Sequence, residues 1–536
     1  MKLKKMPIGI QSFRKIIEGD YVYADKTQYI YELLNNASYY FLSRPRRFGK
    51  SLLLDTIAET FSGDKELFKG LYIYDSDYSF ERHPVLRFDM SNISNETPQA
   101  LKESLVNALN IRAEEEGFNL IGSIPADIFK HLISSLHRKY NKTVVVLIDE
   151  YDKPILDRLA KLDIAEENRE VVRSFYGVLK SMDAHLRMTF ITGVTKFTKT
   201  SIFSGLNNLL DITMSKRYVN ICGIAVEDLE KYFGAYIERL KALEYFSRYD
   251  GIEEEILKWY DGYSWDGINR VLNPFSLLYF FTEEVFKGYW YSSGTPTFLI
   301  EMLKEKPASY ISLRNLEISE WSMDSFDIRR MEPESLLFQT GYLTVKEVPP
   351  HYGTPTYLLE IPNFEVREAF NLHILAGFTE SSDVFAESSY RKMKEAFRNC
   401  DLQAVLETLR GLFASIPYQL HVDAEAYYHS IFYAIMILLG FDISAEVSTA
   451  RGRIDAVLEL ESKVYIIEFK YIKCESDISE ENKQKLFDEA LDSGMKQIKD
   501  KGYDEKYSAS GKAIHHAAFA FLGRDDIKFT HAAPAK

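Results

Sequence analysis

The chain has 536 residues, a formal net charge of −14, 46% hydrophobic residues and 14% aromatic residues. This much apolar material excludes an intrinsically disordered protein and supplies core for about three or four domains of ~150 residues each. The acidic balance excludes a protein that coats nucleic acid indiscriminately, although it is compatible with a local basic groove.

Cysteine usage and apolar runs bear on the cellular compartment. Cys222, Cys400 and Cys474 stand far apart, with neither a CxxC pair nor a zinc-ligand spacing, so buried and reduced thiols are expected. The basic first residues are followed by no apolar core, which is atypical of a signal peptide. The longest apolar stretch, 431–441, is too short to cross a bilayer. These features predict a cytoplasmic protein without a membrane partner.

The first 224 residues alternate strands with helices. Strands are expected at 39–42, 84–89, 143–150 and 187–193, and helices at 27–35, from 52 onwards, at 97–117, 125–140 and 166–182. The run 143–150 is the strongest strand signal, because a continuous β-branched run is typical of a strand buried on both faces. The alternation predicts an α/β domain with a parallel sheet over residues 1–224.

The pattern then becomes mainly helical. Within 225–375, residues 336–345 indicate a helix end, a glycine cap and a strand, and a second strand and a short helix follow over 356–370. This order favours a helical and winged-helix-like lid, although a generic α+β lobe fits nearly as well. A helical linker is expected at 376–415, and a last unit with its own strand–helix alternation at 416–536.

A phosphate site is indicated where the first strand meets the following helix. In a P-loop, backbone N–H groups wrap the phosphates, a lysine reaches the β/γ oxygens, a hydroxyl ligates Mg²⁺ and the helix N-terminus adds its positive end. Gly49, Lys50 and Ser51 stand at this junction. We therefore predict binding of ATP or a close relative. The expected nucleotide contacts are Arg44, Arg46, Arg47, Phe48, Gly49, Lys50, Ser51 and Leu52.

The loop departs from the general pattern GxxxxGK[ST] at its first glycine, where this chain has Arg44. Pro45 and the pair Arg46 and Arg47 are expected to stiffen the loop and to add charge towards the phosphates. The alternative is a basic strand–helix turn with an ordinary exposed lysine.

An acidic pair completes this site. The strand 143–150 ends in Asp149 and Glu150, which places one carboxylate beside Mg²⁺ and the next where it can polarise a water. We predict that Asp149 binds the metal together with Ser51, and that Glu150 is the general base of hydrolysis. The alternative is that the pair caps the following turn.

Two further groups are candidates near the γ-phosphate. Thr192 ends the next strand, where a polar residue commonly senses this phosphate, and Thr195 and Lys196 compete with it for the role. Arg329 or Arg330 could supply a transition-state arginine, although a solvated helix face is the simpler expectation for both.

A second acidic site follows from counting along a hairpin. The apolar strands 453–460 and 463–470 flank a two-residue turn, so Asp455 opposes Glu468. Opposed residues have Cβ atoms about 5 Å apart on one face of the sheet. Lys470 lies two residues beyond Glu468 and projects from the same face.

Carboxylates this close repel unless a proton or a metal compensates. A Mg²⁺ bound by Asp455 and Glu468 would remove this cost and could activate water against a phosphodiester, with Lys470 steadying the developing charge. Glu425 could complete the metal shell, and Gln497 could orient the lysine or a phosphate. The alternative is a surface hairpin with an Asp/Lys network, which the apolar flanks disfavour.

These motifs resemble those of the bacterial AAA-ATPase-like domain-containing proteins, and the resemblance covers nearly the whole chain. The matching segments are 7–13 (PIGIQSF), 23–27 (YADKT), 44–51 (RPRRFGKS), 148–152 (IDEYD), 191–194, 201–208, 260–263, 273–276 and 339–342. The resemblance implies a P-loop ATPase domain followed by a restriction-endonuclease-like domain of the PD-(D/E)XK nuclease superfamily. It also implies that an arginine at position 44 is normal.

For the C-terminal unit, the resemblance implies that Asp455, Glu468 and Lys470 match the nuclease core, with Glu425 and Gln497 as looser matches. The leading hypothesis is therefore Mg²⁺-dependent ATP hydrolysis that gates a site cleaving DNA or RNA. A rival is a nucleotide-switched module whose C-terminal domain binds nucleic acid or protein without cutting it. A third hypothesis is a signalling scaffold in which hydrolysis resets a homo-oligomer.

Overall fold

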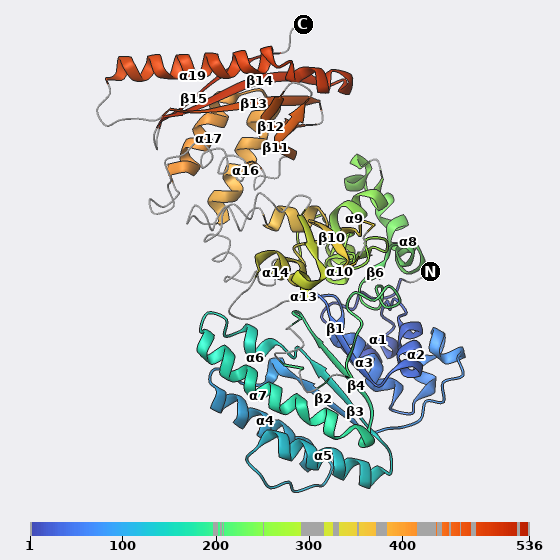
Figure 1. Ribbon diagram of the computed structural model, residues 1–536. Helices are drawn as coiled ribbons and strands as arrows, with labels where there is room; N and C mark the ends of the chain where they lie inside the picture. Colours follow the sequence, from blue (N-terminus) through green and yellow to red (C-terminus); the bar gives the residue numbers. More distant parts are fainter. Residues whose placement is uncertain are drawn as a thin grey trace. The chain divides into compact units, whose positions relative to one another are not determined.

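The structure is a computed structural model (Figure 1). It describes residues 3–196, 202–203, 206, 208–249, 251–290, 316–324, 332–350, 353–370, 383–414, 436, 442–449, 452–460, 462–472, 479–522 and 526–533. The chain forms two compact units. The first comprises Met1–Gly294 and Leu313–Val366, and the second comprises Thr295–Ser312 and Arg367–Lys536.

A five-stranded parallel sheet forms the core of the first unit. Its spatial order is β2 (Val85–Asp89), β3 (Val144–Asp149), β4 (Leu186–Gly193), β1 (Tyr39–Ser43) and β5 (Leu210–Asp211). Every residue of β1 and β3 is buried, as their continuous apolar runs require. The predicted α/β fold with a parallel sheet is confirmed. The two-residue strand β5 has no signal in the sequence.

Helices surround this sheet. They are α1 (Phe13–Glu18), α2 (Thr27–Asn36), α3 (Lys50–Thr60), α4 (Pro98–Glu115), α5 (Pro125–Tyr140), α6 (Lys153–Leu156) and α7 (Leu162–Ser181). Helices α4, α5 and α7 contact one another beside the sheet (Figure 1). The rings of Phe129 and Phe175 stack there with centroids 4.6 Å apart, and both meet Phe88 of β2 edge-on. This aromatic cluster packs α5 and α7 against β2, whose last residue is Asp89.

The rest of the first unit is helical and then mixed. It contains α8 (Val226–Lys241), α9 (Ile252–Tyr260), α10 (Pro274–Glu283), α13 (Glu320–Asp324), α14 (Pro333–Thr340), the short pair β6 (Ile224–Ala225) and β7 (Val271–Leu272), and the three-stranded sheet β8 (Leu316–Ser319), β10 (Thr356–Glu360) and β9 (Thr344–Glu347). Gly341 ends α14 in the left-handed conformation with φ +92°, as the predicted glycine cap requires.

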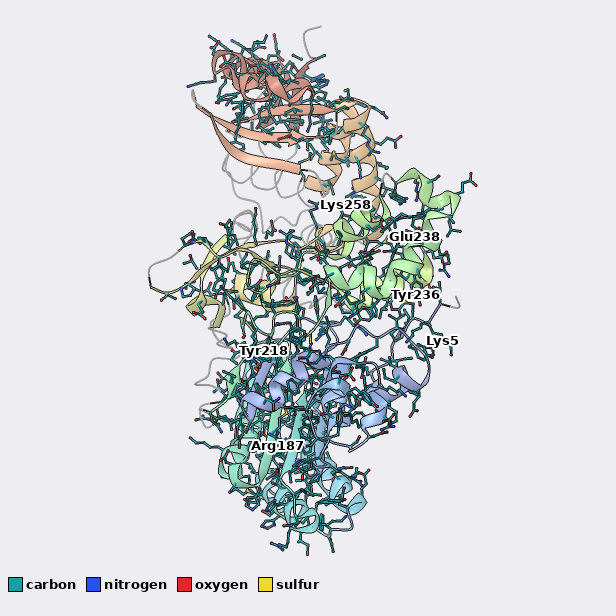
Figure 2. The ribbon with its side chains drawn as sticks, turned by 90° about the vertical axis from the view of Figure 1, so that its right-hand side faces the viewer. Lys5, Arg187, Tyr218, Tyr236, Glu238 and Lys258 are labelled. Atoms are coloured by element: carbon teal, nitrogen blue, oxygen red, sulfur yellow. The ribbon has the colours of Figure 1, made fainter. Side chains whose placement is uncertain are left out.

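The N-terminal segment packs on these helices. The Tyr236 hydroxyl of α8 donates to the carbonyl oxygen of Lys4, and Figure 2 labels Tyr236 and the adjacent Lys5. Val22 belongs to the same apolar cluster as residues of α8, α9 and α10. Residues far apart in the sequence therefore form one core. Among the described helices, none is both long enough and apolar enough to cross a membrane.

The second unit contains a mixed five-stranded sheet. Its order is β11 (Asp442–Thr449), β12 (Gly452–Glu459), β13 (Lys463–Ile472), β14 (Ala513–Leu522) and β15 (Asp526–Ala532), and only β13 and β14 pair in parallel. Helix α19 (Glu480–Asp500) lies along β13 and β14 (Figure 1), and α16 (Asp383–Arg398) packs against α17 (Leu402–Ala414). This β-rich unit agrees with the predicted restriction-endonuclease-like fold.

Candidate functional site

The loop between β1 and α3 has the backbone of an anion-binding turn. Gly49, the N-cap of α3, has φ +88°, and Arg47 also has a positive φ of 71°. Left-handed residues in such a loop turn successive N–H groups towards one point, which is the arrangement that binds phosphate. Glycine at position 49 is required by this conformation rather than by space, because an added Cβ would meet no atom within 4 Å.

Lys50 lies buried across this loop. Its Nζ donates to the carbonyl oxygens of Arg44 and Pro45, at 2.9 Å each. Burial lowers the pKa of Lys50, while the carboxylates of Asp149 and Glu150 act in the opposite direction. The alternative of an exposed lysine is therefore excluded, and the ammonium lies in the loop close to the acidic strand end.

The Arg44 side chain is buried, and protein groups occupy its guanidinium. Its guanidinium is fully buried, 3.8 Å from the ring of Trp265, and its Nη1 donates to the carbonyls of Ser43 and Thr213 at 2.9 Å each. Burial lowers its pKa to about 10. A direct contact between this side chain and a nucleotide does not fit the geometry. Arg44 instead supports the loop from within.

The other predicted loop contacts divide into two groups. Arg46 and Arg47 are exposed, and the Arg47 guanidinium lies over the ring of Phe275 at 4.6 Å. Phe48 is buried against Tyr263, with ring centroids 4.7 Å apart. Ser51 follows in the first turn of α3, and its carbonyl oxygen accepts from Arg87 of β2.

The acidic pair stands at the carboxyl end of β3. Asp149 is buried, and its Oδ1 accepts from the N–H of Glu150 at 3.0 Å. Glu150 has a positive φ of 50°, which is strained for a residue with a Cβ and is typical of functional positions. Burial raises the pKa of Glu150, opposed by Lys50, and a raised pKa suits a general base that works near neutral pH.

Asp152 is a buried acid that the sequence analysis did not single out. Its Oδ2 accepts from the N–H of Val194 at 3.0 Å and from both the N–H and the hydroxyl of Thr195 at 2.6 Å. Gly193 permits this approach, because an added Cβ would lie 2.5 Å from the ring of Tyr151. Asp152 therefore ties the turn after β3 to the end of β4.

These contacts separate the three candidate sensors. Thr195 is bound to Asp152, and the Nζ of Lys196 pairs with Asp211 at 2.6 Å. Thr192 is buried near the end of β4, and its hydroxyl has no hydrogen-bond partner among the described residues. Thr192 is thus the candidate whose hydroxyl is available to a ligand. Arg329 and Arg330 lie outside the described residues.

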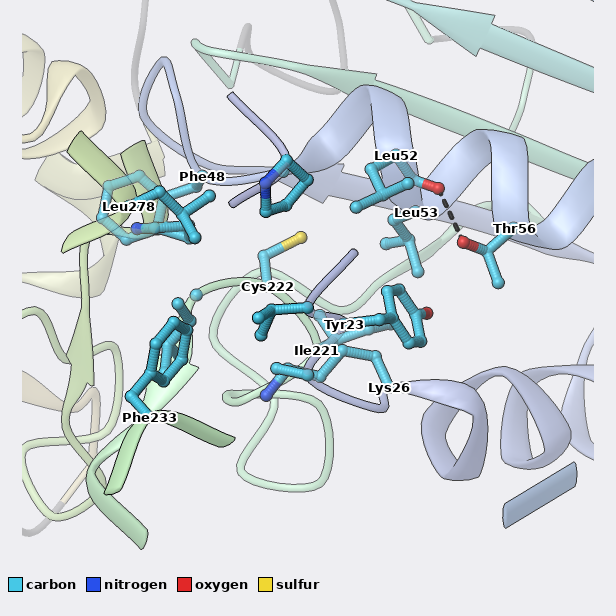
Figure 3. Close-up of a pocket in the computed structure, with 17 residues that line it drawn as sticks. Tyr23, Lys26, Phe48, Leu52, Leu53, Thr56, Ile221, Cys222, Phe233 and Leu278 are labelled. Carbon is cyan, nitrogen blue, oxygen red and sulfur yellow. Dashed lines mark hydrogen bonds between the residues drawn. The ribbon is translucent and has the colours of Figure 1, made fainter. Parts of the chain in front are cut away.

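An apolar pocket adjoins the P-loop (Figure 3). It is lined by Pro7, Val22, Tyr23, Ala24, Lys26, Phe48, Gly49, Leu52, Leu53, Thr56, Ile221, Cys222, Gly223, Ile224, Phe233, Pro274 and Leu278. The N–H of Gly223 donates to the carbonyl of Phe48, which joins the segment after β5 to the loop. Sequence reasoning noted the segments at 7–13 and 23–27 without assigning them a role, because the pocket forms only from residues distant in the chain.

The cysteines are partly as expected. Cys222 is buried in this pocket, and burial raises the pKa of its thiol. Cys400, after the end of α16, is half-buried rather than buried. Cys474 lies outside the described residues.

The second candidate site has the register that the hairpin arithmetic predicts. Ala456 pairs with Ile467, so the preceding residue Asp455 stands opposite Glu468. Asp455 Oδ2 accepts from the N–H of Phe469 at 2.9 Å. Glu468 is fully buried, and burial, followed by the neighbouring Asp455 carboxylate, raises its pKa to about 8.

Lys470 and Gln497 complete this cluster. Lys470 Nζ lies 3.5 Å from Glu468 Oε2 and donates to Gln497 Oε1 of α19 at 2.9 Å. The helix approaches closely because it has Gly494, where an added Cβ would lie 2.9 Å from the Cβ of Ala518. The hydrogen bond between Lys470 and Gln497 is therefore consistent with the predicted role of Gln497 in orienting the lysine.

The chemistry of this pair fits a hard cation. Glu468 Oε1 is buried, and no described residue donates a hydrogen bond to it. Carboxylate oxygens are the ligands that Mg²⁺ prefers. Glu425, the predicted third ligand, lies outside the described residues. Within the described part of the chain, no third His, Cys, Asp or Glu joins the pair to form a metal-binding group.

Comparisons with known proteins match one family to each of the two parts of the chain that carry these candidate sites. A family described as "Predicted AAA-ATPase" matches residues 7–203, and the "PD-(D/E)XK nuclease superfamily" matches residues 423–530. The chain is similar to a protein of Azotobacter chroococcum mcd 1 that is described as an uncharacterized protein in the vnfD 5′ region. The two are 38% identical over 523 residues, which cover 96% of each chain.

Proposed function

Because this chain belongs to the family of AAA-ATPase-like proteins that carry a C-terminal PD-(D/E)XK nuclease superfamily domain, we propose that it is a Mg²⁺-dependent ATPase whose nuclease-like domain acts on nucleic acid. The observation that carries the proposal is the position of Lys50, buried in the loop between the carbonyls of Arg44 and Pro45 and beside Asp149 and Glu150. ATP turnover by a variant without this lysine is the direct test.

In the proposed ATPase reaction, the Lys50 ammonium leaves the loop carbonyls and pairs with the β/γ-phosphate oxygens. Ser51 and Asp149 would hold Mg²⁺, which neutralises charge on the phosphates. A water attacks the γ-phosphorus, the bond to the bridging oxygen of ADP breaks, and Glu150 accepts the proton of the attacking water. The Thr192 hydroxyl donates a hydrogen bond to a γ-phosphate oxygen, because this buried hydroxyl has no partner within the described part of the chain.

The apolar pocket of Figure 3 is the proposed site of the nucleotide base. It adjoins the P-loop through Phe48 and Gly49, and apolar side chains dominate the residues that Figure 3 labels. A planar base gains from leaving water for such a pocket, whereas a phosphate chain does not.

This assignment predicts that Ala24→Phe, which fills the pocket, weakens ATP binding roughly tenfold or more, since overpacking and the loss of base contacts combine. Isothermal titration with ATP and with inorganic triphosphate measures the two contributions. Triphosphate affinity is expected to stay unchanged in this variant. Ala242→Phe, at the exposed end of α8, is the control. An equal loss for both ligands would place the base elsewhere.

For the second site, we propose that Asp455 and Glu468 hold Mg²⁺ and that Lys470 steadies the charge that develops on a phosphodiester during cleavage. The metal would supply an activated water and polarise the phosphoryl oxygen. Gln497 fixes the direction of the lysine.

Metal binding here should be detectable without any substrate. Mg²⁺ at about ten times its dissociation constant is expected to slow hydrogen exchange of the β12 and β13 amides roughly tenfold, because it stabilises the folded pair. The double variant Asp455→Asn/Glu468→Gln should show no such effect, and Asp149→Asn should respond as wild type. Equal protection by Mg²⁺ in the double variant would contradict the site.

One observation favours the rival function of binding without cleavage. Glu468 is fully buried, and burial raises its pKa to about 8, so this carboxyl is protonated at neutral pH until a metal displaces the proton. A nuclease-like domain whose carboxyl keeps this proton would hold nucleic acid without cutting it. Binding of a labelled duplex together with no nicking by wild type would support this rival.

A further inference from the structure

The P-loop is enclosed by a later segment of the same compact unit. The contacts are Arg44 with Trp265 (3.8 Å from guanidinium to ring centroid), Phe48 with Tyr263 and Trp265 (ring centroids 4.7 and 5.7 Å apart), Arg47 with Phe275 (4.6 Å), Pro45 with Gly341, and the Arg46 carbonyl with Trp290. Each of the five residues 44–48 therefore contacts one or more later residues of the chain, namely Tyr263, Trp265, Phe275, Trp290 and Gly341.

Trp290 differs from the other contacts because it bonds to the main chain of the loop. Its indole Nε1 donates to the carbonyl oxygen of Arg46 at 3.2 Å. The two preceding carbonyls, of Arg44 and Pro45, accept from Lys50. Three consecutive carbonyls are therefore occupied. When a nucleotide draws Lys50 away from the carbonyls of Arg44 and Pro45, the Trp290 indole still holds the carbonyl of Arg46.

Glu365 in turn fixes Trp290. This fully buried carboxylate accepts from the N–H of Trp290 through Oε1 at 2.6 Å, and the same oxygen accepts from the N–H of Tyr289. Asn363 caps the turn that presents it, with Oδ1 accepting from the N–H of Val366 at 3.0 Å. Burying a carboxylate costs free energy of folding unless hydrogen bonds compensate. The N–H groups of Tyr289 and Trp290 provide these bonds, so the carboxylate holds the backbone of both residues in place.

We infer that Glu365 is a positioning residue for the nucleotide site, which acts through Trp290 on the main chain of the P-loop. The inference rests on the proposed ATPase function and adds the element that sets the loop geometry. The relay runs from the carboxylate to the Trp290 backbone, then through the indole to the Arg46 carbonyl. Through these contacts, the affinity for nucleotide depends on the position of the segment that carries Trp290.

The relay should also respond to pH. Burial raises the pKa of Glu365 to about 7, and the hydrogen bonds from the N–H groups of Trp290 and Tyr289 act in the opposite direction. Among the described residues, the titratable groups that interact with it are Tyr260, Tyr263 and Tyr289, and burial keeps their hydroxyls neutral. Above this pKa the ionised carboxylate accepts stronger hydrogen bonds than the neutral acid. Trp290 is then held more firmly.

The test compares steady-state ATP hydrolysis by wild type, Trp290→Phe, Glu365→Gln and the control Trp259→Phe. Trp259 also donates through its indole, but to Glu255 of its own helix. Trp290→Phe keeps a ring and loses the donor, so KM for ATP should rise roughly tenfold at unchanged kcat, as for one lost hydrogen bond to a buried carbonyl. A merely structural defect would instead lower kcat at unchanged KM, because fewer molecules are folded.

Glu365→Gln keeps an acceptor and removes the titration. The ratio of its KM to the wild-type KM should rise about threefold from about pH 6 to about pH 8, because the wild-type KM falls as the Glu365 carboxylate ionises. The ratio between the two proteins cancels the titration of ATP itself. Unchanged KM in both variants, with wild type turning over ATP, overturns the inference and leaves the proposed function intact. A wild type that binds no ATP overturns both.

Discussion

Replacement of Lys50 by alanine is expected to lower kcat/KM for ATP by roughly 10²–10³-fold or more, in line with the loss of one preorganised charge at a transition state. The ammonium is buried in the loop, so no solvent cation can replace it at the same place. Its removal also takes away the positive charge that interacts electrostatically with the carboxylates of Asp149 and Glu150. Phosphate release from ATP under excess Mg²⁺ measures the effect.

Two variants make this result specific. Lys50→Arg keeps the charge but brings a planar fork in place of a compact ammonium, so it should not restore turnover. Lys139→Ala removes a lysine that pairs at the surface with Glu116, and it should turn over ATP as wild type does. Turnover by a clean Lys50→Ala preparation at the wild-type rate would refute the ATPase proposal.

Local patterns were sufficient to predict several parts of the molecule. The strand Val144–Asp149 follows from a continuous β-branched run and the helix Pro125–Tyr140 from its apolar periodicity, because each buries its own apolar residues. The hairpin register also follows from counting, since side chains alternate strictly along a strand and a two-residue turn fixes the pairing. Asp455 and Glu468 are therefore opposed in the structure as in the sequence analysis.

Contacts between distant segments could not be predicted in this way. Arg44 is a predicted nucleotide contact because it stands in the P-loop segment, at the position of the first glycine. The fold instead buries it under Trp265, which stands 221 positions later in the chain (265 − 44). The pocket beside the loop combines the N-terminal segment with residues 221–224 and α10, so no single stretch of sequence carries its signal. The sequence shows only the separate motifs at 7–13 and 23–27, to which no role could be assigned.

The C-terminal site gives the second large effect. If Asp455 and Glu468 hold a catalytic Mg²⁺, their joint replacement by alanine should abolish metal-dependent nicking of DNA or RNA, a loss of roughly 10³-fold or more, since the metal supplies both the activated water and the phosphoryl polarisation. The assay follows nicking of supercoiled plasmid and of labelled single strands at fixed Mg²⁺, with and without ATP. Glu459→Ala, on the same strand but paired with Lys512 away from the cluster, should cut as wild type does.

Each outcome of this assay has a distinct reading. Nicking that depends on ATP and vanishes in Lys50→Ala would connect the two sites, whereas nicking that is indifferent to ATP would assign cleavage to the second unit alone. Equal nicking by wild type and the double variant would trace the activity to a contaminant and refute the cleavage proposal. The alanine pair relieves the repulsion between the two carboxyl groups but also removes the acceptor of the Phe469 N–H. Thermal unfolding of both proteins without Mg²⁺ separates the two effects, and loss of cutting at unchanged Tm is assigned to the metal site.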